Sequence, residues 1–187
     1  FLRVISGQRK GYRLKGPKSL NIIPTEDRIK ESMFNILGYI SDESLVLDLC
    51  AGTGSIGIEF LSRGAKKAFF VDRSRESIQC IRENLIHTKF EDRAEVIKND
   101  AIKSIAIFGQ KHISFDYIFT DPPYKSVELI NSIIENVSKW NILKEDGVFI
   151  VEHEKDLILA DQMYRLKRID YREYKDTCLS FYTLVED

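Results

Sequence analysis

Short apolar segments alternate with amphipathic segments over more than half of this chain, and no other feature of the sequence constrains the fold as much. The apolar segments have the length of buried strands and lie at residues 45–49, 68–71, 94–98, 115–120 and 147–151. The segments between them show helical spacing and lie at 55–63, 75–87, 101–108 and 127–140. Strands that alternate with helices imply right-handed crossovers and a parallel sheet covered on both faces. We therefore predict an α/β fold with a Rossmann-like, mostly parallel sheet.

The last part of the chain breaks this alternation. The segments YRLKRIDYREY (164–174) and CLSFYTLV (178–185) both have the pattern of strands, and too few residues separate them for a crossover helix. They predict an antiparallel pair that closes the sheet, so that the last strand is antiparallel. An unrelated C-terminal extension on a Rossmann-like sheet is the alternative.

The N-terminal residues carry an excess of positive charge. Residues 1–30 contain eight lysines or arginines against two acids, a net charge of +6, which leaves −7 for the rest of a chain whose formal net charge is −1. The segments LRVIS and YRLKG flank a polar GQRKG link and predict a β-hairpin with exposed basic positions. We therefore predict a basic β-hairpin arm at 1–22 for a polyanion, followed by the main domain at 23–187. A solvated basic hairpin is the alternative.

A helix is predicted directly after the arm. Pro24 and Thr25 precede two acids, which is the pattern of a helix start. Apolar residues then recur at helical spacing as far as Gly38; they are Ile29, Met33, Phe34, Ile36 and Leu37. We expect this helix to pack on the main domain.

Composition excludes several classes of protein. With 187 residues, of which 43% are hydrophobic and 30% charged, the chain fits one ordinary globular domain with a small appendage. It has no run of the roughly 18 apolar residues that a membrane span requires, and no secretory signal pattern, so we expect no membrane association and a cytoplasmic location. The three cysteines lack metal-ligand spacing and are typical of free thiols in a reducing compartment, and we expect no metal site.

An aspartate stands at the end of each of the first four predicted strands. These aspartates are Asp48, Asp72, Asp100 and Asp121. Ligands of such sheets bind outside the carboxyl ends of the strands, so the four side chains are candidates for one site. Aspartate is also common where a strand turns into a helix cap, but that explanation must then apply four times in succession. After the first strand, the loop in VLDLCAGTGSIG adds Gly52, Gly54 and Gly57, which permit close approach of the backbone to a ligand.

The glycine spacing admits two cofactors. The three glycines match the dinucleotide fingerprint G-x-G-x-x-G, and Asp72 follows at a position that could bind a ribose, so an NAD-dependent oxidoreductase is one candidate. Three features weaken it: an acid lies ahead of the glycines, another follows the third strand, and DPPY at 121–124 has no role in hydride transfer. They favour a cofactor with an ammonium group, a ribose diol and an adenine but no pyrophosphate. S-adenosylmethionine has these parts.

The segment DPPY can be a simple turn, because proline fixes the backbone and aspartate caps it. Together with the strand-end acids, however, it resembles class I S-adenosylmethionine-dependent methyltransferases that modify exocyclic amino groups of nucleic-acid bases. More narrowly, nearly the whole chain is similar to the RsmD type, which methylates N2 of a guanine in bacterial 16S ribosomal RNA. The segments that carry this resemblance are RVISGQRKGYRL, PTEDRIKESMFNIL, DLCAGTGSIGIEFLSRGAKKAFFVD and DPPY. Two positions depart from the family pattern: Ile23 stands where arginine is common, and Cys50 where phenylalanine is usual.

The resemblance implies a set of residues for S-adenosylmethionine. This set is Asp48, Ala51, Gly52, Thr53, Gly54, Asp72, Asp100 and Ala101. The backbone of the glycine loop would meet the methionine moiety, and Asp48 would meet the loop and the ammonium group. Asp72 would bind the ribose hydroxyls, while Asp100 and the backbone of Ala101 would meet the adenine.

The resemblance also implies the catalytic residues, which are Asp121, Pro122, Pro123 and Tyr124. A guanine amino nitrogen is a poor nucleophile because its lone pair is delocalised into the ring. If Asp121 and the carbonyl of Pro122 accept its two hydrogens, the lone pair can be aimed at the methyl group. Tyr124 would stack on the base after it leaves its helix or loop, with simple core packing as the alternative.

The implied RNA contacts are Arg3, Arg9, Lys10, Arg13 and Arg28. The partner would be 16S ribosomal RNA in a small ribosomal subunit or an assembly intermediate, bound by a monomer. Two alternatives are an adenine-N6 methyltransferase acting on DNA or RNA and a non-catalytic RNA-binding ribosome assembly factor. Such DNA enzymes usually carry a sizeable target-recognition region, for which this chain has no room, and a binding factor has no reason to keep DPPY.

Overall fold

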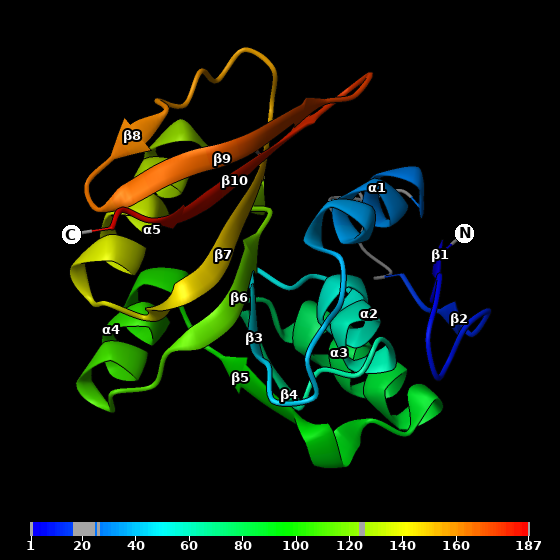
Figure 1. Ribbon diagram of the computed structural model, residues 1–187. Helices are drawn as coiled ribbons and strands as arrows, with labels where there is room; N and C mark the ends of the chain where they lie inside the picture. Colours follow the sequence, from blue (N-terminus) through cyan, green and yellow to red (C-terminus); the bar gives the residue numbers. More distant parts are fainter. Residues whose placement is uncertain (1, 17–24, 26, 124–125, 187) are drawn as a thin grey trace.

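The computed structural model describes residues 2–16, 25, 27–123 and 126–186, and it contains an eight-stranded sheet with helices on both faces (Figure 1). The strands of this sheet are β3 (Leu45–Leu49), β4 (Lys67–Asp72), β5 (Ala94–Lys98), β6 (Phe115–Thr120), β7 (Leu143–His153), β8 (Gln162–Met163), β9 (Leu166–Glu173) and β10 (Cys178–Leu184). The helices are α1 (Asp27–Leu37), α2 (Ser55–Ser62), α3 (Arg75–Thr88), α4 (Ala101–Gln110) and α5 (Val127–Lys139), with a 3-10 turn η1 at Glu91–Arg93. A separate two-stranded sheet joins β1 (Leu2–Arg3) to β2 (Arg13–Leu14).

The order of the strands in the large sheet is β5-β4-β3-β6-β7-β10-β9-β8. Strands β3 to β7 are parallel to one another, and β10 joins β7 in the antiparallel direction. This confirms the predicted Rossmann-like α/β fold with a mostly parallel sheet. From β3, the chain proceeds to β4 and β5 on one side and later to β6 and β7 on the other. Such a reversal opens a crevice at the carboxyl ends of the strands, where ligands of α/β sheets bind.

The antiparallel end of the sheet also agrees with the sequence pattern. Strand β10 lies between β7 and β9, and its Phe181 pairs with Ile150 on one side and Asp170 on the other. The last strand is thus the antiparallel one that the short connection predicted. The two-residue strand β8 pairs with the start of β9 and is too short to give a periodic signal.

Two hydrophobic clusters lie on opposite faces of the sheet. Helices α1, α2 and α3 cover one face, with Phe34, Phe60 and Ile81 among their buried side chains. Helices α4 and α5 cover the other face with Phe108, Ile133 and their neighbours. The strands contribute to both clusters because successive side chains point to opposite faces, as adjacent phenylalanines of β4 do.

One strand begins earlier than predicted. The sequence placed the start of the fifth strand at Gly147, whereas β7 begins at Leu143. Its pairing with β6 is irregular, since Leu143 pairs with Phe115 and the next pair joins Val148 to Tyr117. The polar segment KEDG, which has the composition of a turn, therefore forms an irregularity within the strand.

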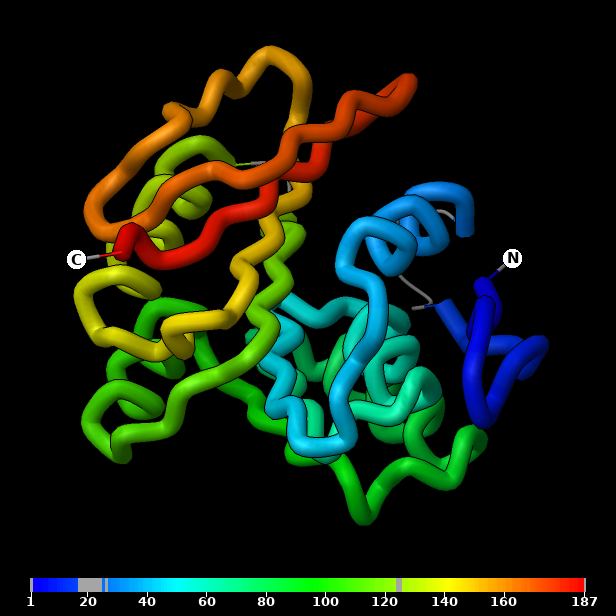
Figure 2. The backbone as a smooth tube through the Cα atoms, viewed as in Figure 1, coloured from blue at the N-terminus to red at the C-terminus, as the bar shows by residue number. Residues whose placement is uncertain are grey.

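The N-terminal hairpin has much shorter strands than its sequence suggested. Only two residues of each side pair, with Leu2 opposite Leu14 and Arg3 opposite Arg13. Beyond these pairs, Val4 still exchanges backbone hydrogen bonds with Tyr12 and Gly11. The next amides, of Ile5, Ser6 and Arg9, bond to side chains of α2. The chain path shows this arm against the helices of the first sheet face, with the two termini on opposite sides of the view (Figure 2).

The described residues contain neither a candidate membrane-spanning helix nor a candidate metal cluster. None of their helices has both the length and the apolar character that a membrane crossing requires. Nor do these residues contain three or more histidine, cysteine or acidic side chains grouped so that they could hold a metal ion.

Candidate functional site

The glycine loop and the turn that begins DPPY leave adjacent strands at the same level of the sheet. In the parallel pair β3 and β6, Leu49 is opposite Thr120, the last residue of β6. The hydroxyl of Thr120 donates a hydrogen bond to the carbonyl of Leu49 at 3.1 Å, and this bond is buried. Asp121 and Cys50 therefore begin two neighbouring loops on the carboxyl edge. The fold brings together two motifs that lie about 70 residues apart in the sequence.

The glycine loop between β3 and α2 depends on conformations that suit glycine. Gly52 and Gly54 have φ values of 59° and 81°, and Gly54 is the residue that caps the start of α2. At Gly57, a Cβ atom would lie 2.3 Å from the Phe70 ring of β4, so the helix packs on the sheet only because the side chain is absent. The amide of Ala51 bonds to the carbonyl of Val71 at 2.9 Å, which fastens the loop to β4.

Asp48 is buried beneath this loop. Its side chain is 1% exposed, and Oδ2 accepts a hydrogen bond from the amide of Gly57 at 3.0 Å. The pKa of the Asp48 carboxyl is raised to about 8, mainly because the group is buried; the Gly57 bond opposes this shift, and the nearby charges of Asp72 and Asp121 add to it. Three strand-end acids therefore lie close enough to interact. Asp48 bonds to the first turn of α2, directly after the loop, and its charge is unfavourable unless a cation lies nearby. Its predicted contact with the ammonium group of the cofactor stays a prediction.

Asp72 joins the end of β4 to two backbone segments. Its Oδ2 accepts from the amide of Gly52 at 2.9 Å, and its Oδ1 accepts from the amide of Ser74 at 2.8 Å. Ser74 in turn caps α3, because its side chain accepts from the amide of Ser77. The partly exposed carboxylate of Asp72 thus lies between the glycine loop and the start of α3, and it keeps further acceptor positions.

Asp100 lies one strand farther from the glycine loop, after β5. It is the N-cap of α4, with Oδ1 accepting from the amide of Lys103 at 3.0 Å. The neighbouring amide of Asn99 bonds to the carbonyl of Asp72 at 3.1 Å, which ties the two strand ends together. Ala101 is buried in the first turn of the helix. The capping role that the sequence offered as a simple explanation therefore holds for Asp100, which also lines the same sheet edge.

The start of the DPPY segment follows β6 directly. Asp121 is partly exposed, Pro122 is buried and Pro123 is exposed. Tyr124 lies outside the described residues, so its predicted stacking role stays a prediction. Asp121 also lies near Cys50, whose thiol pKa rises to about 12 because it is buried and because Asp72 and Asp121 add negative charge. The thiol is therefore protonated and unsuited to act as a nucleophile.

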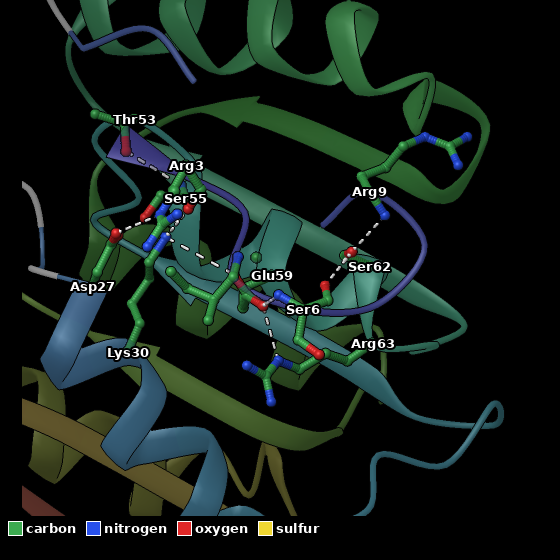
Figure 3. A network of polar contacts seen from close by, with 12 residues as sticks. Arg3, Ser6, Arg9, Asp27, Lys30, Thr53, Ser55, Glu59, Ser62 and Arg63 are labelled. Atoms are coloured by element: carbon green, nitrogen blue, oxygen red, sulfur yellow. Dashed lines mark hydrogen bonds and ion pairs between the residues drawn. The ribbon is translucent and has the colours of Figure 1, made fainter. Parts of the chain in front are cut away.

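A buried ionic network holds the arm on α2 and α1 (Figure 3). Glu59 of α2 accepts from the amides of Ile5 and Ser6 at 2.8 and 3.1 Å, and from Nε of Arg63 at 2.8 Å. Lys30 of α1 lies 3.9 Å from Glu59, both side chains being fully buried, and donates to the carbonyl of Arg3 at 2.6 Å. The arm is thus a fixed part of the molecule, built on the helix that begins at the glycine loop.

The five predicted RNA-contacting side chains differ in how far they are engaged within the protein. Lys10, Arg13 and Arg28 are exposed. Arg3 forms an ion pair with Asp27 at 2.8 Å and is half exposed. Arg9 is the most engaged, because its Nε donates to the carbonyl of Thr88 at 2.7 Å and its guanidinium lies on a phenylalanine ring. Arg9 therefore anchors the arm, whereas Lys10 and Arg28 have exposed side chains that a polyanion could reach.

Arg28 also lines a polar groove between α1 and the β9–β10 hairpin. The groove has a volume of ≈ 520 Å³ and is lined by Arg28, Glu31, Ser32, Asn35, Ile36 and Arg172. A hydrogen bond between the hydroxyls of Ser32 and Tyr174 spans the helix and the hairpin. The groove thus brings two arginines, Arg28 of α1 and Arg172 of β9, to one side of α1.

The sequence analysis did not assign a role at the site to two buried polar residues that lie near it. Glu152 of β7 accepts from the hydroxyl of Thr25 at 2.8 Å, and both side chains are buried. Because Val151 pairs with Thr120, Glu152 stands level with Asp121 on the neighbouring strand. The start of α1 is thus fixed to the same sheet edge as the turn that begins at Asp121. The signal in the sequence was an acid directly after the apolar run VFIV, at the end of the fifth predicted strand.

Comparison with known proteins identifies the family of this chain. A family model described as conserved hypothetical protein 95 matches residues 2–183. The chain belongs to this family, the RsmD-type S-adenosylmethionine-dependent methyltransferases. The resemblance that the sequence motifs indicated is therefore confirmed.

Relatives of this RsmD-type chain carry consistent names. It is 36% identical over 181 residues to the rRNA methyltransferase YlbH of Bacillus subtilis, covering 97% of this chain and 98% of the relative. It is 34% identical over 183 residues to ribosomal RNA small subunit methyltransferase D of Haemophilus influenzae, with 94% of each chain covered. Among solved structures, the methyltransferase yhhF of Escherichia coli superposes with a TM-score of 0.85 at 26% identity, covering 98% of both chains.

Proposed function

We propose that this protein transfers the methyl group of S-adenosylmethionine to the N2 amino group of a guanine in 16S ribosomal RNA, within a small ribosomal subunit or an assembly intermediate. Membership of the RsmD-type family supports the cofactor and the reaction, and the relatives named as ribosomal RNA small subunit methyltransferases support the RNA. The choice of guanine N2 is supported by the basic hairpin and the 24–37 segment, because other amino methyltransferases share DPPY.

The observation that carries the proposal is the pairing of Leu49 with Thr120. It places the glycine loop and the turn at 121–123 side by side on the carboxyl edge of the sheet. A methyl donor held by the loop would lie next to an amino group held by the turn. Transfer requires this in-line approach, and correct orientation of reactants can supply several kcal/mol of the barrier reduction.

The residues around the loop fit S-adenosylmethionine. Asp48 is a buried carboxyl with two other acids nearby, so an ammonium group would relieve both its desolvation and the repulsion. Asp72 uses two of its roughly four acceptor positions on backbone amides, which leaves acceptors for ribose hydroxyls. Asp100 and Ala101, one strand farther, would border the adenine. When bound, the cofactor supplies an electrophilic methyl group attached to a sulfonium.

In the proposed reaction, Asp121 and the carbonyl of Pro122 accept the two hydrogens of the guanine amino group. This interaction directs the nitrogen lone pair away from the ring and toward the methyl carbon. The amino nitrogen forms its bond to that carbon as the carbon–sulfur bond breaks, and it then releases one proton, which Asp121 is placed to accept. Pro122 is suited to present its carbonyl because it has no N–H and a fixed φ. Tyr124 completes the proposal as the residue that stacks on the base.

The exposed basic residues of the arm and of α1 would bind RNA phosphates. The arm supplies positive charge through Lys10 and Arg13, and α1 supplies it through Arg28. Contacts of this kind bind phosphates and do not distinguish one RNA sequence from another. Selection of the guanine is left to the site at the sheet edge.

A single labelling experiment tests the proposed function. Labelled S-adenosylmethionine is supplied with small-subunit particles that lack the modification, with naked 16S ribosomal RNA and with DNA, and the nucleosides are then analysed. N2-methylguanosine from a ribosomal substrate is the expected product, and the better substrate shows which assembly state is used. N6-methyladenine would assign the enzyme to adenine instead. Cofactor binding without transfer to any substrate would favour the non-catalytic assembly role.

A further inference from the structure

Asn84 connects the RNA-binding arm to the glycine loop. It lies on α3, it is 1% exposed, and it is not among the predicted site residues. Its Nδ2 donates to the carbonyl of Thr53 in the glycine loop and to the carbonyl of Lys15 in the arm, both at 3.0 Å. Its Oδ1 accepts from the amide of Lys15 at 2.8 Å. One planar carboxamide thus joins two segments that are expected to bind different ligands.

The arm side of this contact is well fixed. The two bonds between Asn84 and Lys15 use both backbone groups of Lys15, as a neighbouring strand would. The thiol of Cys80, one turn earlier on α3, also donates to the carbonyl of Lys15 at 3.2 Å. At the other end of the arm, Ser62 of α2 donates to the carbonyl of Ser6 at 2.6 Å. The arm therefore cannot move at Lys15 without breaking bonds to Asn84.

The loop side is equally constrained. Thr53 is 4% exposed and lies between the two glycines with positive φ. Its carbonyl accepts a hydrogen bond from the buried Nδ2 of Asn84. If this buried donor loses its partner, the protein is destabilised by about 1–3 kcal/mol. Because the carboxamide is rigid, a shift of the Thr53 carbonyl displaces the groups that hold Lys15. The conformation of the glycine loop and the position of the arm are thus linked through one side chain.

We propose that Asn84 is a positioning residue that makes the binding of cofactor and the binding of RNA cooperative. This inference rests on the proposed function, because it takes the glycine loop as the cofactor site and the arm as the RNA site. A cofactor that orders the loop holds Asn84, and Asn84 holds the arm in its RNA-binding position. By linkage, RNA on the arm strengthens cofactor binding by the same factor.

The test measures the affinity for unmethylated small-subunit particles with and without saturating S-adenosylhomocysteine, which binds without turnover. For the wild-type protein, we expect the cofactor product to tighten binding roughly 5- to 20-fold, within the usual range of coupling between two sites. The ratio of interest is the dissociation constant without S-adenosylhomocysteine divided by the constant with it. In Asn84→Ala, we expect this ratio to fall to about one. Asn84→Ser, a smaller disturbance, gives the same comparison if the alanine variant fails to fold.

Ser62→Ala is the matched control. It also removes two partly buried bonds to the arm, one donated to the carbonyl of Ser6 and one accepted from the amide of Arg9. Ser62, however, is the last residue of α2, at the end away from the glycine loop. We expect weaker binding of the particles with the wild-type ratio retained. A purely structural role of Asn84 would lower the melting temperature and both affinities but keep the ratio.

The outcomes separate this inference from the proposed function. A wild-type ratio of one, or an unchanged ratio in both Asn84 variants, overturns the coupling while methyl transfer to guanine still supports the function. Absence of any binding to the particles, together with absence of transfer, contradicts the proposed function and the coupling with it. A ratio that is lost in the Asn84 variants and kept in Ser62→Ala supports the proposal.

Discussion

The carboxylate of Asp72 accepts a hydrogen bond from the amide of Gly52 at 2.9 Å, so the predicted ribose ligand also shapes the predicted methionine loop. We predict that Asp72→Ala weakens the binding of S-adenosylmethionine by at least tenfold, because both the ribose contact and the loop support are lost. Asp72→Asn keeps an acceptor for Gly52 and is expected to have a smaller effect. Isothermal titration calorimetry measures both variants.

Asp116→Ala is the control for Asp72. Asp116 accepts a hydrogen bond from the amide of Leu45 at 2.8 Å, a bond of the same kind at the opposite end of β3. Its loss should lower stability without changing cofactor affinity. If Asp72→Ala binds the cofactor as the wild-type protein does, Asp72 is not part of the cofactor site.

Asp121→Ala should retain the cofactor and lose turnover. The side chain is proposed to orient the amino group, and a misplaced reacting group can reduce the rate on the order of 100-fold. Cofactor affinity should change little, because the glycine loop is formed by the segment between β3 and α2 and not by the turn at 121–123. Single-turnover methyl transfer to saturating small-subunit particles provides the measurement. Transfer at nearly the wild-type rate would disprove the orientation mechanism.

The stability of the cofactor-free protein should fall as the pH rises through the neutral range. Folding raises the pKa of Asp48 from an ordinary 3.8 to about 8, so between these values the folded state keeps a proton that the unfolded state has lost. The contribution of Asp48 to the free energy of unfolding is therefore fully present below its unfolded pKa, and it is lost as the pH rises through its folded pKa. The slope from this group is at most about 1.4 kcal/mol per pH unit.

Asp48→Asn isolates this effect. The amide oxygen can still accept from Gly57, but the side chain no longer titrates. We expect a flatter dependence of stability on pH between about 5 and 8, measured by urea unfolding, together with weaker cofactor binding at pH 8. Parallel curves for the wild-type protein and the variant would show that Asp48 does not carry the pH dependence.

The periodic parts of the fold were predictable from the sequence, and the long-range polar contacts were not. Strand β4 follows from a short continuous apolar run, and helix α3 follows from apolar residues at helical spacing. The directions of the strands also followed, because helical crossovers imply parallel strands and the short last connection implies an antiparallel one. By contrast, the hairpin strands were overestimated, since a pattern of alternation cannot show that Glu59 takes the amides of Ile5 and Ser6.

The same limit applies to the candidate site. The acids at strand ends could be listed because strand ends share one edge of a parallel sheet. Asn84 could not be assigned a role, because a polar residue on the apolar face of a helix shows only that some partner exists. Its partners in the arm and in the glycine loop are 69 and 31 residues away, and only the packing of α3 brings them together.

Charge removal on the exposed part of the arm should weaken RNA binding without affecting the fold. Lys10 is exposed at the turn of the hairpin, so Lys10→Ala should weaken binding of small-subunit particles uniformly and reduce the salt slope by about one. Lys111→Ala, an exposed lysine just after α4, is the control and should leave binding unchanged. Equal salt slopes for Lys10→Ala and the wild-type protein would exclude Lys10 from the RNA contact.

The arm should detach when its buried ionic network is broken on one side only. Glu59→Gln leaves the ammonium group of Lys30 buried without its charged partner, and such a loss typically destabilises a protein by about 3–5 kcal/mol. Burial already lowers the pKa of Lys30, with Glu59 opposing this shift, so the variant should favour neutral Lys30. Lys30→Met added to Glu59→Gln removes the stranded charge and should recover part of the loss. A double-mutant cycle in urea measures this coupling, and strictly additive effects would show that Glu59 holds the arm through its backbone bonds alone.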